Sequence, residues 1–164
     1  GKGFAAALDS NEAILSACAS GADVPGLLDA TSLSEEDRGL LTRLAFIPGK
    51  LDHMKRLVSA GLDPDVPDSM GLPPLHVAGW NGLVEEMAFF LTLQPDLTRK
   101  NDYGGDALDT VIHGSEFAPK RPEADHLSCA RLLLEAGSVL YPDFISGCGN
   151  EDMVQFLEDW RDAH

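Results

Sequence analysis

A helical segment that ends near a glycine or an acidic turn recurs along this chain of 164 residues. The clearest copies are 50–61 and 126–137, and a similar segment is 83–96. Weaker copies begin at Asn11 and at Gly149. In each copy, apolar residues recur at the spacing that lines one face of an α-helix. The copies therefore predict a set of similar helices, each with one face to bury.

A shorter helix is expected before each of these segments. The clearest is 74–81, which begins with a proline, and Gly82 follows it. Proline suits the first helical turn because its missing N–H has no helical partner there. Gly61 and Gly137 close their longer helices at a position that often needs a positive φ. Each unit is thus predicted as helix, turn, helix, turn, and such units must stack to bury both faces.

The segment 71–78 carries a motif that resembles the signature of the ankyrin-repeat family. Its sequence, Gly-Leu-Pro-Pro-Leu-His-Val-Ala, is similar to the Gly-x-Thr-Pro-Leu-His-x-Ala that opens the first helix of an ankyrin repeat. The Gly-Ala-Asp of 21–23 and the Gly-Leu-Asp of 61–63 resemble the turn after the second helix. Gly49 and Gly82 are also 33 residues apart, which is the ankyrin period.

The resemblance implies an all-α ankyrin-repeat solenoid in a single domain. About five helix-turn-helix units are expected, of which the first and last are degenerate. In the first unit, 4–8 would be the remnant of a first helix. The approximate units are 1–28, 29–67, 68–100, 101–139 and 140–164.

The motif and the spacing both depart from the family pattern. Pro73 stands where the family has threonine, so the hydroxyl that would bond the motif histidine, His76, is missing. About seven extra residues lie within the acidic stretch 25–38, and roughly ten lie within 114–124. We predict a projecting loop over 114–124 because its two prolines forbid a continuous helix. A binding role for this loop is favoured by its apolar Phe117, and a neutral insertion is the alternative.

The charge of the chain is strongly acidic. Twelve Lys and Arg stand against 27 Asp and Glu, which gives a net charge of −15. Such a surface repels nucleic acid and anionic membranes, because binding either one relies on basic groups that neutralise phosphate. It would speed encounter with a basic protein, although the same charge also serves solubility.

The remaining global features favour a cytoplasmic protein. No apolar run approaches the roughly 18 residues of a membrane span, and no secretory signal is visible. The three cysteines, Cys18, Cys129 and Cys148, are widely spaced and form no CxxC pair. We expect them to be reduced thiols among apolar neighbours.

Candidate catalytic and metal-binding groups are few. No two of the five histidines share a helix face at i, i+4, and the aspartates of 63–68 lack the glycine and glutamate of a calcium loop. Asp125, His126 and Cys129 imitate a catalytic set, but Cys129 lies on the apolar stripe, where a thiol stays protonated. His76 and His126 match positions of structural histidines in ankyrin repeats. We expect no enzymatic activity, no metal and no cofactor.

The resemblance also implies where a partner binds. In ankyrin repeats, the end of the first helix and the tips of the connecting fingers face a concave groove. Carrying these positions across, and adding the inserted aromatic, predicts contacts at Ser69, Met70, Leu72, Trp80, Asn81, Asp102, Tyr103, His113 and Phe117. Large side chains such as Trp80 dominate interface energies. The alternative for Trp80 is a place in the core.

These features predict a non-enzymatic protein-protein interaction module that is a monomer on its own. It would hold a basic protein through its concave face and the 114–124 loop. The alternative is a dedicated inhibitor, such as an immunity protein that neutralises a bacterial toxin or enzyme.

Overall fold

The computed structural model describes the backbone of residues 2–164 and the side chains of 11–29 and 31–164. All regular elements in this part of the chain are helical, which confirms the predicted all-α class. In chain order they are α1 (Lys2–Ser20), η1 (Ala30–Ser32), α2 (Glu35–Arg38), α3 (Leu40–Leu44), α4 (Leu51–Ser59), α5 (Pro74–Asn81), α6 (Val84–Thr92), α7 (Ala107–Phe117), α8 (His126–Glu135), α9 (Pro142–Ser146) and α10 (Glu151–Ala163).

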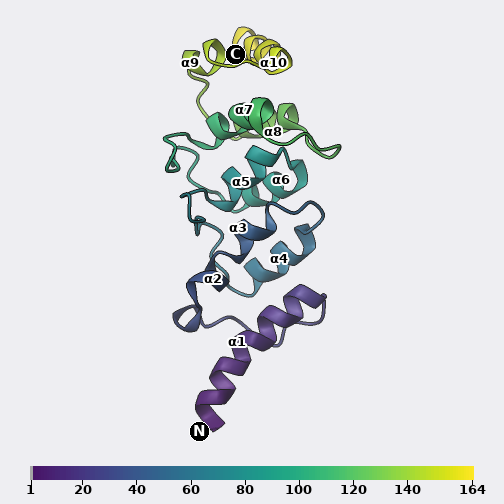
Figure 1. The fold of residues 1–164 in the computed structure, drawn as a ribbon, viewed down its shortest axis with the longest axis vertical. Helices are drawn as coiled ribbons and strands as arrows, with labels where there is room; N and C mark the ends of the chain where they lie inside the picture. The colour runs from purple at the N-terminus through teal and green to yellow at the C-terminus, as the bar shows by residue number, and fades with distance from the viewer. Residues whose placement is uncertain (1) are drawn as a thin grey trace.

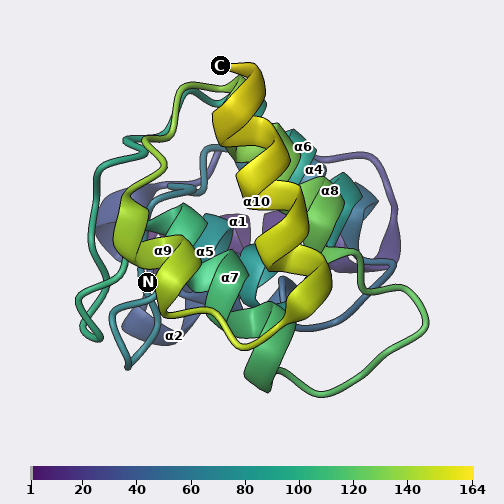
Figure 2. The same cartoon turned by 90° about the horizontal axis from the view of Figure 1, so that it is seen from above.

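The helices stack in pairs along the long axis of the molecule (Figure 1). α3 contacts α4, α5 contacts α6, α7 contacts α8 and α9 contacts α10. Along the stack, α5 lies between α3 and α7, and α6 lies between α4 and α8. Seen from the C-terminal end, the first helices and the second helices of the pairs form two layers (Figure 2). α1 packs on α4 at one end of the stack and α10 packs on α8 at the other.

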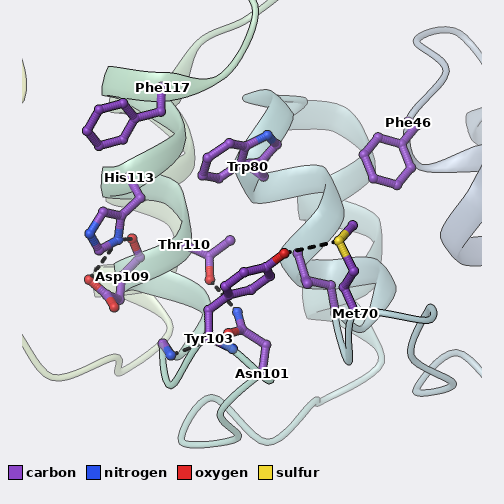
Figure 3. A pocket seen from close by; sticks show the side chains of 11 residues that line it. Phe46, Met70, Trp80, Asn101, Tyr103, Asp109, Thr110, His113 and Phe117 are labelled. Carbon is purple, nitrogen blue, oxygen red and sulfur yellow. Dashed lines mark hydrogen bonds and ion pairs between the residues drawn. The ribbon is translucent and has the colours of Figure 1, made fainter.

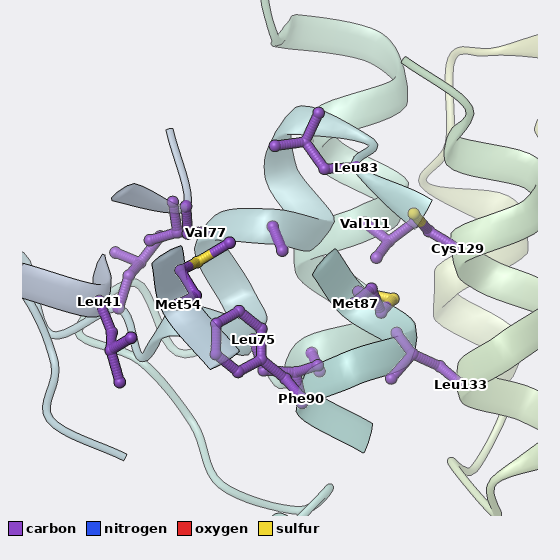
Figure 4. Packing of buried hydrophobic residues seen from close by; sticks show 14 of the residues in the cluster. Leu41, Met54, Leu75, Val77, Leu83, Met87, Phe90, Val111, Cys129 and Leu133 are labelled. Carbon is purple, nitrogen blue, oxygen red and sulfur yellow. The ribbon is translucent and has the colours of Figure 1, made fainter. Parts of the chain in front are cut away.

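One hydrophobic core runs through the stack (Figure 4). Both helices of the pairs supply it, and the longer helices do so from the faces that the apolar spacing predicts. Its fully or almost fully buried side chains include Leu41, Met54, Leu57, Val77, Met87, Phe90, Val111, Cys129, Leu133, Met153 and Leu157. Because each pair buries its apolar residues against the next pair, the core depends on stacking.

The predicted helix ends are confirmed at the glycines. Gly61 follows the end of α4 with a φ of 110°, and Gly137 follows the end of α8 with a φ of 111°. Only glycine adopts such angles without strain. Each of these glycines also donates its N–H to a carbonyl of the last helical turn.

Two segments differ from the expectation. The predicted helical remnant 4–8 is not separate, because α1 is one continuous helix. The prediction that 114–124 is a loop is wrong for 114–117, which form the last turn of α7. The helix ends at Ala118, whose ψ of 153° is the extended angle that a following proline imposes.

The rest of this insertion is tied to the stack at two points. The backbone N–H of Asp125 donates to the carbonyl of Gly82 at 2.8 Å. Nη1 of Arg121 donates to the carbonyl of Phe46 at 3.0 Å, across 75 positions of sequence. The segment 118–125 therefore lies beside two neighbouring helix pairs.

No helix in the described part of the chain is both long enough and apolar enough to cross a membrane.

Candidate partner-binding groove

A groove of about 490 Å³ lies where the ends of α5 and α7 meet the connections that precede them (Figure 3). Six of the nine residues predicted to contact a partner line it, namely Met70, Leu72, Trp80, Tyr103, His113 and Phe117. The other lining residues are Phe46, Asn101, Gly105, Asp109 and Thr110. The helix-end and finger positions thus converge on one surface.

Three of the predicted residues do not line the groove. Ser69 and Asp102 are exposed beside it. Asn81 is only 4% exposed, and its Nδ2 donates to the carbonyl of Val77, one turn earlier, at 2.9 Å. The Asn81 side chain therefore bonds to the backbone of its own helix, α5, and does not line the groove.

The groove exposes large apolar side chains. Phe46, Met70, Tyr103 and Phe117 retain between 36% and 73% of their accessible surface. Trp80 lies among them at the end of α5 and is partly buried. A gathering of exposed apolar side chains on one surface is typical of an interaction site.

Phe46 was missed in the sequence, although a signal for it exists. The 33-residue register that aligns Gly49 with Gly82 also aligns Ile47 with Trp80. Phe46 and Ile47 are therefore a large apolar pair at the same point of the preceding unit. Both remain exposed in the structure.

A buried network of hydrogen bonds supports the floor of the groove. Nδ2 of Asn101 donates to Nδ1 of His76 at 3.1 Å and to the hydroxyl of Thr110 at 2.9 Å. Oδ1 of Asn101 accepts from the backbone N–H of Tyr103 at 2.9 Å. The motif histidine thus bonds to the next helix pair in place of the missing threonine at position 73.

His76 is held in its neutral form. It is 2% exposed, and burial, followed by the nearby positive charge of Arg99, lowers its pKa to about 4. Nδ1 must be unprotonated to accept the bond from Asn101. Neither Asn101 nor Thr110 was predicted, because only the fold brings them beside His76.

The two connections that border the groove are also tied to each other. The hydroxyl of Tyr103 donates to Sδ of Met70 at 3.1 Å. Oδ1 of Asp68 accepts from the backbone N–H groups of Met70 and Leu72 at 2.9 and 3.0 Å. In the sequence, Asp68 is one of the aspartates of the segment 63–68. In the structure its carboxylate orders the turn that carries Met70.

The backbone of Trp80 lies tightly between two later helices. A Cβ added to Gly114 of α7 would come within 2.9 Å of the Cα and carbonyl carbon of Trp80. From α8, Nε2 of His126 donates to the carbonyl oxygen of Trp80 at 2.8 Å. Burial lowers the pKa of His126. Its bond to Trp80 links α8 to α5, which is the structural role predicted for this histidine.

Asp125, His126 and Cys129, which resemble a catalytic set in the sequence, have structural roles. Cys129 is fully buried in the core, and burial, together with the charges of Asp125 and Glu86, raises its pKa to about 12. Its thiol is therefore protonated and inert, as predicted. Asp125 caps α8 by accepting from the backbone N–H of Ser128 at 3.0 Å. The described residues contain no cluster of histidine, cysteine and acidic side chains suited to a metal.

Comparisons with known proteins give a likeness of fold. No protein-family model matches the chain, and no curated protein does. A solved structure does match, namely the Bd0816 predatory endopeptidase from Bdellovibrio bacteriovorus in complex with the immunity protein Bd3460. The likeness has a TM-score of 0.56 and 22% sequence identity, and covers 75% of this chain and 64% of the matched chain. This chain therefore spans somewhat less than two thirds of that chain's length, and the likeness shows the fold alone.

Proposed function

We propose that this chain is an ankyrin-repeat protein that binds another protein in its groove. The motif at 71–78 supports the family, since its helix α5 pairs with α6 inside a stack of similar pairs. The observation that carries the binding role is the groove itself. It gathers Trp80, Tyr103 and Phe117, which are the kind of side chains that anchor interfaces, on a rigid scaffold.

We further propose that binding serves to inhibit an enzyme, as an immunity protein does. The likeness to a complex of an endopeptidase with an immunity protein favours this role over that of a general adaptor. The net charge of −15 supports an enzyme with a basic surface as the partner. No catalytic role for this chain is required, because occupancy of the enzyme is sufficient.

The experiment that tests this proposal has two stages. The immobilised protein is first exposed to lysate and culture medium of the source organism at low and at raised salt, and retained proteins are identified by mass spectrometry. Retention that weakens with salt is expected, because complementary charge is screened. The captured enzyme is then purified, and its activity is measured while the chain is titrated in.

The two stages separate the candidate roles. Loss of enzymatic activity at a one-to-one ratio would support the inhibitor. Tight binding that leaves the activity of the captured protein unchanged would contradict inhibition and favour an adaptor. If neither lysate nor medium yields a salt-sensitive basic partner, the proposed acidic inhibitor is wrong.

The variant Trp80→Ala is expected to weaken binding of the captured partner by about 2 kcal/mol or more, about thirtyfold. The indole is the largest side chain of the groove, and its truncation removes apolar contact area from the centre. The backbone carbonyl that accepts from His126 is retained, so folding should change little. Calorimetric titration measures the affinity, and thermal melting measures the stability.

Leu27→Ala is the matched control. Leu27 is 74% exposed and lies outside the groove, so its truncation should leave the affinity unchanged. A large drop in melting temperature with unchanged affinity in Trp80→Ala would assign the indole to the core.

A further inference from the structure

The chemistry of the groove is mostly aromatic, with one carboxylate. Trp80, Tyr103 and Phe117 supply ring surfaces, and Asp109 of α7 supplies the acid. No lysine or arginine is among the described residues that line it. Arg121, which is not among the lining residues, bonds through its guanidinium to the carbonyl of Phe46. Phe46 and Asp109 lie on opposite sides of the groove in the view of Figure 3.

Asp109 is placed to receive a positive charge. Its side chain is 22% exposed, and its Oδ1 lies 3.2 Å from Nδ1 of His113. The same Nδ1 lies 3.0 Å from the backbone carbonyl of Asp109, which offers it a second acceptor. Oδ2 of Asp109 has no hydrogen-bond donor among the described residues. This carboxylate therefore keeps acceptor capacity toward the groove.

Apart from the ring that follows α3, the aromatic rings of the groove come from α5, from α7 and from the connection that precedes α7. The imidazole of His113 stacks on Phe117, with centroids 6.5 Å apart and planes inclined by 19°. Tyr103 and Trp80 lie across from them in Figure 3, and the hydroxyl of Tyr103 is fixed by its bond to Met70. Flat π faces attract a cation, and they do so more strongly where water is partly excluded.

We propose that the groove receives an arginine side chain of the partner protein. The aliphatic stem would lie along Met70 and Trp80, and the guanidinium would lie over the rings and pair with Asp109. This proposal rests on the proposed function in one respect, namely that the occupant belongs to a protein. It goes beyond that function because it states which side chain of the partner is recognised.

Arginine fits better than the other candidate side chains. An apolar side chain would offer no donor to Oδ2 of Asp109, which is costly when water is excluded from the groove. The lysine ammonium is more strongly hydrated and presents no flat face. The guanidinium is planar, stacks on aromatic rings and bonds a carboxylate through two N–H groups. The acidity of the whole chain favours the same charge.

The test uses the full chain and three short peptides, so it does not depend on identifying the partner. The probes are acetyl-Gly-Arg-Gly-amide, its lysine counterpart, and its citrulline counterpart, which keeps the shape of arginine without the charge. Each is titrated into isotopically labelled protein while the indole N–H signal of Trp80 is followed by NMR. Trp160, which stacks on His164 away from the groove, is the internal reference.

The arginine peptide should shift the Trp80 signal to saturation and leave that of Trp160 in place. The citrulline peptide should bind at least about tenfold more weakly, because it lacks the charge that pairs with the carboxylate. The lysine peptide should fall between the two. The inference is overturned if citrulline matches arginine, or if no peptide shifts the Trp80 signal.

Two variants with the same change in net charge locate the effect. Asp109→Asn should reduce arginine binding to the citrulline level. Asp52→Asn should leave it unchanged, because Asp52 is exposed on α4 and lies outside the groove. Equal losses in both variants would show general attraction to an acidic protein and would refute the site. Arginine binding together with failure to inhibit the captured enzyme would refute only the proposed function.

Discussion

Replacing Gly114 with alanine is expected to destabilise the protein by about 3 kcal/mol, which is the upper range for overpacking a tight interior. The new Cβ would meet the Cα and carbonyl carbon of Trp80 at 2.9 Å, far inside normal contact distance. These are backbone atoms, so relief requires a shift of α5 against α7. The gain in helix propensity from glycine to alanine is only about 1 kcal/mol and does not compensate.

Urea unfolding monitored by circular dichroism measures this loss, with Gly26→Ala as the control. A Cβ at Gly26 would meet no atom within 4 Å, so this variant should unfold within about 0.5 kcal/mol of the parent. If Gly114→Ala unfolds at the same urea concentration as Gly26→Ala, the close approach of α7 to α5 is not as described.

The same contact matters for the groove. Gly114 follows His113 and begins the last turn of α7, which carries Phe117, while Trp80 lies in the last turn of α5. The distance between the two helices therefore sets the distance between the rings on either side of the groove. A Gly114→Ala protein that still folds is expected to bind its partner less tightly, because its anchors are displaced.

Much of the groove could be predicted because it depends on register. In a stack of similar units, residues at the same position of each unit lie in one row, so the spacing of glycines is enough to align them. That alignment predicts that Met70, Trp80 and Tyr103 share one surface, and all three line the groove. Extending the register one unit back places Ile47 in the row of Trp80, and Phe46, its neighbour in sequence, lines the groove.

Other features depend on contacts that register does not encode. Pro73 shows that the usual partner of His76 is missing, but nothing in the sequence shows that Asn101 replaces it from the next unit. Asn81 occupies a groove-facing position in the family pattern, yet its amide bonds to its own helix. The turn 114–117 continues α7 because the prolines that end the helix act only from Ala118 onward. In each case a local hydrogen bond or steric limit overrides the pattern.

Acid is expected to destabilise the protein through His76, by up to about 3 kcal/mol between pH 6.5 and pH 4. The folded protein holds the pKa of His76 at about 4, whereas an unfolded histidine titrates near its ordinary 6.5. Between these values the unfolded state binds a proton that the folded state excludes. Stability is therefore full above pH 6.5, falls as the pH is lowered, and stops falling from this cause below about pH 4.

The variant His76→Asn isolates this effect from the many carboxylates that titrate nearby. An asparagine oxygen can take the place of Nδ1 as acceptor for Asn101, but it does not titrate. The variant should be less stable than the parent at pH 7, because the smaller side chain leaves space in the core. The difference between the two should shrink by about 3 kcal/mol in urea unfolding at pH 4. A difference that stays constant with pH would contradict the neutral, buried histidine.

Protonation of His76 is also expected to affect the binding surface. Protonation of Nδ1 would set an N–H against the amide N–H of Asn101, which otherwise holds the turn at Tyr103 through its Oδ1. We therefore expect partner affinity in the parent to decline only as the pH falls through about 4, where the folded protein takes up this proton. In His76→Asn the decline should be smaller, because the bond beneath the groove no longer depends on a proton.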